Sequence, residues 1–157
     1  MATTSRVPAA LDALVAICRA APALAEARII DGPPPSTNLT ERDRLYLGYA
    51  PGAEQAVDLQ QEFAGAGART RNESFHIACY AETRGGDKDL SFRRARVFEI
   101  VAAVEAALRA TDAAPEAPTL NGAVLWSELT TGALLQEQGP DGLLAGLSFT
   151  VACRARI

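Results

Sequence analysis

Two long β segments near the end of the sequence constrain the fold most, because so short a connection forces them to pair. They run over residues 123–137 and 143–157, and Pro140, Asp141 and Gly142 supply the turn between them. Arms of about 14 residues, at about 3.4 Å per residue, would be nearly 50 Å long, well beyond a usual strand. The sequence therefore predicts a long C-terminal hairpin, 123–157, which projects in part, with a bend or bulge at Gly132.

Apolar side chains with the helical period predict two helices. The first covers residues 7–21, with Pro8 in its first turn. The second covers residues 88–111 and begins with Asp87 or Asp89 as its N-cap. Alanines dominate the far side of the second helix, so another element can approach that side closely, and Phe92 lies off its apolar stripe.

Four segments between the helices alternate apolar and polar residues, as strands do: 27–31, 43–50, 56–63 and 74–83. A loop rich in proline, residues 32–40, separates the first two. The order is one helix, four strands, a second helix and two long strands, with no βαβ repeat. We therefore expect a single α+β domain over residues 1–157, built as an antiparallel β-sheet flanked by two helices.

Composition narrows the function classes. The chain of 157 residues is 48% hydrophobic and 22% charged, which is ordinary for a folded globular domain, and its formal net charge of −4 disfavours a duplex-binding protein. No apolar run reaches the roughly 20 residues that span a bilayer, so we expect no membrane association. Asp12 and Arg19 interrupt the N-terminal apolar stretch, which therefore does not read as a signal peptide.

The sequence contains no arrangement of residues typical of catalysis. Cys18, Cys79 and Cys153 lack metal-binding or redox spacing and are predicted to be buried, reduced thiols. His76 is the only histidine and has no partner at a catalytic spacing. Acidic residues follow Gly85 and Gly86 and would occupy the helix N-terminus in place of a phosphate. We expect no enzyme activity, no cofactor and no metal.

Basic residues crowd the middle third of the chain. Arg69 and Arg71 lie on a glycine-rich connection, and Arg84 follows the fourth strand. These three arginines and Phe92 are the candidate partner-facing residues. The alternative is a solvated surface of mixed charge, which is the usual meaning of such runs.

Several segments together resemble the tail terminator and related neck proteins, or minor tail proteins, of long-tailed bacteriophages. They are RIIDGPPP at 28–35, LYLGY at 45–49, FAGAGARTRNESFHIAC at 63–79, the alanine-rich helix after GGDKD, and FTVACRARI at 149–157. The resemblance implies a virion neck subunit, assembled in the bacterial cytoplasm, that forms a homo-oligomeric ring, typically a hexamer. Such a ring caps the tail tube protein, meets the head-to-tail connector proteins, and can lie close to DNA in the channel.

Two other interpretations remain open. A head-to-tail connector or stopper from the same neck region has the same size, charge and lack of catalytic residues. A small ligand-binding or enzymatic α+β domain of the host would instead use a pocket near His76, Tyr80 and Trp126. The order of the ring, and the face that meets the tube or the head, are not fixed by the residues.

Overall fold

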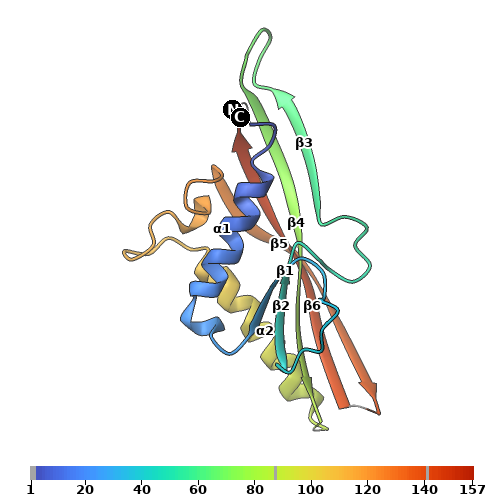
Figure 1. The fold of residues 1–157 in the computed structure, drawn as a ribbon. Coiled ribbons are helices and arrows are strands. Elements are labelled where there is room, and N and C mark those ends of the chain that lie inside the picture. The colour runs from blue at the N-terminus through green and yellow to red at the C-terminus, as the bar shows by residue number, and fades with distance from the viewer. Residues whose placement is uncertain (1–2, 87, 141) are drawn as a thin grey trace.

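A long twisted sheet with two helices on one of its faces forms the protein (Figure 1). The computed structural model describes residues 3–86, 88–140 and 142–157. The helices are α1 (Val7–Ala20) and α2 (Leu90–Ala107), with two short 3-10 helices, η1 (Pro22–Leu24) and η2 (Ala117–Thr119). The strands are β1 (Arg28–Asp31), β2 (Asp43–Leu47), β3 (Val57–Phe63), β4 (Arg71–Gly85), β5 (Trp126–Gly139) and β6 (Gly142–Arg156). The predicted order of elements is confirmed.

The strand β4 organises the sheet, whose order is β1-β2-β4-β6-β5. Both β2 and β3 pair antiparallel with the same edge of β4, β2 with residues 79–83 and β3 with residues 71–77. Ala78 joins the two pairings, because its carbonyl accepts from Gly48 N and its N–H donates to Ala56 O. The sequence predicted strand four over residues 74–83, so it missed residues 71–73, where the end of β3 pairs, and residues 84–85.

Both helices cover the same face of the sheet, which we call the helix face. The residues of β4 that were predicted to share a face, Phe75, Ile77, Cys79 and Ala81, are all 0% exposed beneath the helices. From α1, Leu14 and Cys18 enter the same core. The other face of the sheet carries no helix, and we call it the open face.

The helix α2 is shorter than the predicted 88–111. Asp89 caps it, since its carboxylate accepts a hydrogen bond from Phe92 N at 3.1 Å. The alternative cap, Asp87, lies outside the described residues. None of the helices in the described part of the chain is long and apolar enough to cross a membrane.

One pairing differs from the predicted antiparallel sheet, because β1 runs parallel to β2. Pro33, Pro34 and Pro35 cannot form a tight hairpin turn, so the extended loop returns the chain to the end where β1 began. Leu39 of this loop packs on the open face against a small apolar cluster that contains Tyr46 and Tyr80. The remaining pairings are antiparallel.

The strands β5 and β6 form the predicted C-terminal hairpin, and their register shifts between Leu129 and Gly132, at the predicted bulge. However, β6 also pairs with β4 from Leu143 to Arg156. The hairpin therefore lies within the sheet along its length, with β5 as the edge strand.

Candidate functional site

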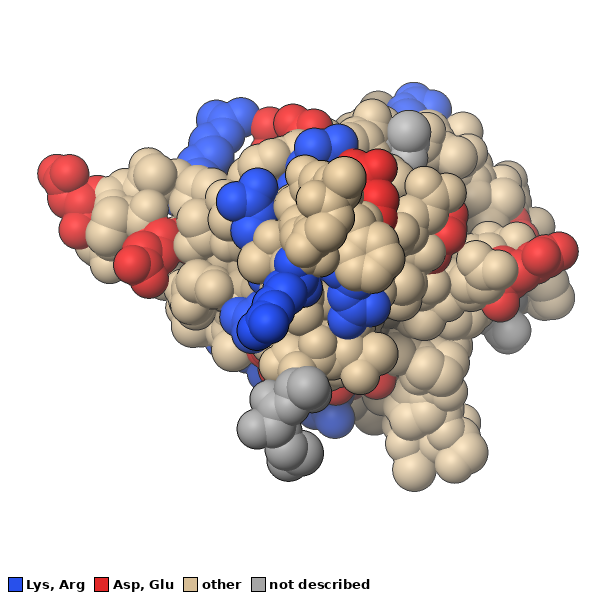
Figure 2. All heavy atoms as spheres, turned by 90° about the horizontal axis from the view of Figure 1, so that it is seen from above, with Lys and Arg blue, Asp and Glu red and all other residues tan. Residues whose placement is uncertain are grey.

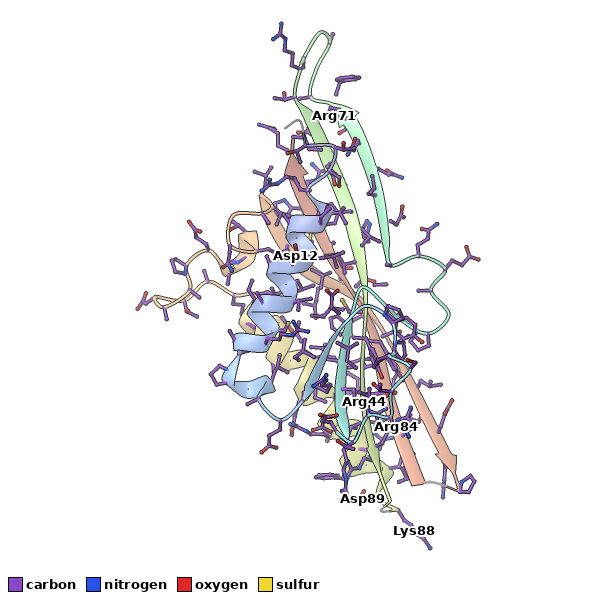
Figure 3. The ribbon with its side chains drawn as sticks, viewed as in Figure 1. Asp12, Arg44, Arg71, Arg84, Lys88 and Asp89 are labelled. Atoms are coloured by element: carbon purple, nitrogen blue, oxygen red, sulfur yellow. The ribbon has the colours of Figure 1, made fainter. Side chains whose placement is uncertain are left out.

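The structure separates the four candidate partner-facing residues into two groups. Arg71 begins β4 and Arg84 nearly ends it, which places them about 44 Å apart along an extended strand. Figure 3 shows Arg71 at the upper end of the molecule and Arg84 near the lower end. Arg69 lies in the exposed β3–β4 loop, near Arg71, whereas Phe92 begins α2, near Arg84. On one chain the four residues therefore form two surfaces.

The upper end of the sheet is basic. Figure 2 looks down on this end, where basic side chains gather around the centre of the view and acidic ones lie mainly toward its sides. The register of β4 with β6 brings Arg156 opposite Asn72, whose side-chain oxygen accepts from Arg156 Nε at 3.2 Å. Arg71 Nη1 donates to Gln61 Oε1 at 2.9 Å. The arginines of this basic end are Arg69, Arg71, Arg154 and Arg156.

The sequence analysis missed Arg154 and Arg156 as candidates. Their spacing of two in a terminal strand puts both on one face, which is a usable signal. What the sequence did not supply is the register that brings this strand beside Arg71.

At the lower end, Glu82 is buried on the open face and is surrounded by donors. Arg44 Nη1 and Arg84 Nε both lie 3.4 Å from Glu82 Oε1. The Tyr46 hydroxyl donates to the same oxygen at 3.3 Å. Arg84 keeps about half of its side chain exposed, so it remains available to a partner while it neutralises the carboxylate.

A hollow of about 530 Å³ opens above this cluster, between the sheet and the proline-rich loop. Tyr46, Tyr49 and Tyr80 line it, and the Tyr46 and Tyr80 rings stack at 5.9 Å between centroids. Burial, with a smaller contribution from Glu82, raises the pKa of both Tyr46 and Tyr80. Both phenols therefore stay protonated at neutral pH and act as neutral hydrogen-bonding groups, not as bases.

An apolar groove of about 440 Å³ lies on the helix face, between α2 and β5. Phe98 and Leu134 form its walls and are 49% and 40% exposed. Leu147 and Phe149 of β6 form its floor. We call this feature the α2–β5 groove, and it leaves large apolar side chains at the surface of the described chain.

The groups that could support chemistry are dispersed. Cys18, Cys79 and Cys153 are buried and free, as predicted, and burial raises the pKa of each thiol to about 12. They are therefore uncharged and inert at neutral pH. Within the described residues, no group of three or more His, Cys, Asp or Glu side chains could hold a metal ion.

The three residues of the predicted host-type pocket do not meet. Tyr80 lines the tyrosine hollow, whereas exposed His76 lines a separate, shallow depression with Asp58 and Thr150. Trp126 of β5 pairs with Arg154 of β6, and Arg154 pairs with Ser74 of β4. Trp126 is therefore level with Ser74, which lies six positions from Tyr80 along β4. Six residues of strand are about 20 Å, so the structure gives these side chains no common cavity.

A comparison of the sequence with protein-family models finds no match. No curated protein matches it either. The fold does have a match. It is similar to a chain of the solved virion of a native gene transfer agent particle, with a TM-score of 0.59 and 14% sequence identity. The alignment covers 98% of this chain and 100% of that chain. At this identity, the likeness shows that the two chains share a fold from end to end.

Proposed function

We propose that the protein is a structural, non-catalytic subunit of a phage-like virion, and specifically a tail terminator. In this role, copies form a ring, typically a hexamer, on the last ring of the tail tube. The ring stops growth of the tube protein and offers a docking face to the connector proteins of the head. It is assembled in the bacterial cytoplasm and remains in the neck of the particle.

The observation that carries the proposal is the end-to-end fold match to a chain of a gene transfer agent virion. The alignment covers 98% of this chain and 100% of that chain, so the likeness extends over the whole fold described above. The sequence segments that resemble neck proteins, such as RIIDGPPP and FTVACRARI, point independently in the same direction.

The distribution of exposed apolar groups supports an assembling protein. Phe63 is 69% exposed on β3, Phe98 is 49% exposed on α2, and Leu125 and Trp126 are 55% and 40% exposed at the start of β5. Large side chains left bare on several sides of a small domain favour contacts with other chains. Heterologous contacts of this kind close into a ring when the rotation between copies permits.

The two groups of candidate residues fit two docking faces. The basic end, with Arg69 and Arg71, would face an acidic partner or the DNA in the channel, and the end with Arg84 and Phe92 would face a second partner. Because β4 spans the molecule between them, one ring can meet different proteins above and below.

Deletion of the gene from the particle-producing host tests the role. A tail terminator predicts tubes of uncontrolled length without heads, as measured in negatively stained lysates, and expression of the wild-type chain in trans restores normal tails. Tails of normal length that fail to join heads would replace the terminator role with that of a connector or stopper. Normal, infectious particles would refute both.

A further inference from the structure

The sheet has a free edge on each side. The strand β3 pairs with β4 alone, and β5 pairs with β6 alone, among the described residues. Each therefore offers a row of backbone donors and acceptors to another strand. Because β3 and β5 lie on opposite sides of β4, a contact between them joins two different copies.

The strand β3 has an apolar side that its own chain leaves bare. Leu59 opposes buried Phe75, and Phe63 opposes Arg71, so both side chains lie on the helix face. They are nevertheless 45% and 69% exposed, because the helices do not extend over this part of the sheet. Asp58 and Glu62 take the open face, whereas Gln61 lies between Leu59 and Phe63 on the helix face and donates to buried Glu73.

The opposite edge of the sheet, at β5, carries an uncovered apolar groove on the helix face. Leu134 opposes Leu147, and Gly132 opposes Phe149, which places this stretch of β5 on the helix face beside the α2–β5 groove. Beyond β5 no strand covers the groove, and Phe98 overhangs it from α2. A strand added to β5 would bring its own helix-face side chains under Phe98.

We propose that β3 of a second copy pairs with the free edge of β5, and that its Leu59 and Phe63 close the α2–β5 groove. This contact rests on the proposed ring and specifies how neighbouring copies meet. Leu59 and Phe63 of one copy then lie on the same face of the continued sheet as Leu134 and the groove of the other.

The strand directions agree with this contact. Both β3 and β6 run antiparallel to β4 and hence parallel to each other, while β5 runs antiparallel to β6. In a ring, all copies point the same way along the axis. The neighbour's β3 therefore meets β5 antiparallel, which is the more stable of the two pairings.

The offset between the two strands also fits a closed ring. Through the register, Leu59 stands level with Ser127, opposite Cys153, and the middle of the groove at Gly132 lies opposite Phe149. The two levels are four positions of β6 apart, about 14 Å. Four strands are about 19 Å wide, and strands tilted by roughly 35–45° need a stagger of about 13–19 Å to close. The observed offset is of this size.

One pair of one-sided variants tests the contact. Leu59→Ser with Phe63→Ser damages the strand side, and Phe98→Asp damages the groove side; the altered side chains are all exposed. In sedimentation velocity and native mass spectrometry, the wild type is expected to form the ring and each variant to fall to one chain of 16.5 kDa. Mixed together, the two variants are expected to form one-to-one dimers and nothing larger, because only one intact contact remains.

Glu105→Ser is the matched control, since the Glu105 side chain is exposed to 52% on the same helix but lies outside the groove. It is expected to keep the ring mass. Thermal unfolding checks that the variants fold, and Leu59→Ala with Phe63→Ala replaces the serine pair if that pair does not. Variants that keep the ring mass would overturn this contact and leave the proposed ring standing. A wild-type chain that sediments only as a monomer would overturn the contact and the ring together.

Discussion

The strands β2 and β3 lie end to end along one edge of β4, and both run antiparallel to it. Their leucine and phenylalanine side chains nevertheless differ in exposure to solvent. Leu45 and Leu47 of β2 are 0% exposed, whereas Leu59 and Phe63 of β3 are 45% and 69% exposed. The helices cover the sheet at β2 and end before β3 (Figure 1).

This difference shows that alternation of apolar and polar residues predicts that one face of a strand will be buried. It does not predict whether the chain itself or another chain buries that face. Residues 43–50 and 56–63 have the same kind of pattern. In β2 the cover comes from the chain's own helices, so the pattern serves stability. In β3 the cover is absent from the chain, and in our account another copy supplies it.

The largest expected effect separates the two strands by stability. Leu45→Ala removes a fully buried side chain and is expected to lower the free energy of unfolding by about 2–5 kcal/mol. Leu59→Ala removes the same atoms from an exposed site and is expected to change it by about 0.5 kcal/mol or less. Urea unfolding of the chain held monomeric by Phe98→Asp measures both, and equal losses would break the comparison.

Next in size is a test of how tightly the open face packs opposite β2. An added Cβ at Gly146 would lie 2.6 Å from the Tyr80 ring, so Gly146→Ala is expected to cost about 1–3 kcal/mol. Gly132→Ala is the control, because its nearest neighbour is at 3.5 Å. Thermal unfolding measures both variants. An unchanged melting temperature for Gly146→Ala would show that Tyr80 moves freely.

A smaller effect is expected at Glu82 of β4, which holds Arg44 and Tyr46 of β2 on the open face. Glu82→Gln keeps the shape of the side chain but removes the charge that Arg44 and Arg84 share, and it is expected to cost about 1–2 kcal/mol. Glu99→Gln, at a side chain 66% exposed, is expected to change the unfolding free energy by less than about 0.5 kcal/mol. If the two variants unfold alike in urea, the buried cluster has no role in holding β2.

The smallest effect on stability is expected at the end of β3. Arg69→Ser with Arg71→Ser removes two charges from the basic end and is expected to shift the unfolding free energy by about 0.5 kcal/mol or less. Assembly of infectious particles is expected to fall if, as we propose, this end faces an acidic partner or DNA. Unchanged infectivity in a plaque or gene-transfer assay would remove these arginines from any docking face.

Local patterns in the sequence predicted most of the elements. Alternation located the strands, Gly132 located the bulge in the hairpin, and Asp89 caps α2 as one of the two predicted caps. Each of these features depends on neighbours within a few residues along the chain, where periodicity and capping chemistry act directly.

Features set by distant pairing were not predicted. The parallel β1–β2 pair depends on the path of the proline-rich loop, and the shared edge of β4 depends on Ala78 meeting both Gly48 and Ala56. Likewise, Arg156 reaches the basic end only through the β4–β6 register. The sequence therefore named only the arginines from the middle of the chain, and the register adds two from the last strand to the same end.

The central claim is that a copy of the same chain covers the bare face of β3 in the assembled particle. Hydrogen–deuterium exchange tests it most directly, measured by mass spectrometry on the isolated chain, held monomeric by Phe98→Asp, and on the wild-type assembly. The account predicts that amides of β3 and β5 become protected on assembly, while those of β2 exchange equally slowly in both states. Exchange in β3 that is as fast in the assembly as in the isolated chain would contradict it.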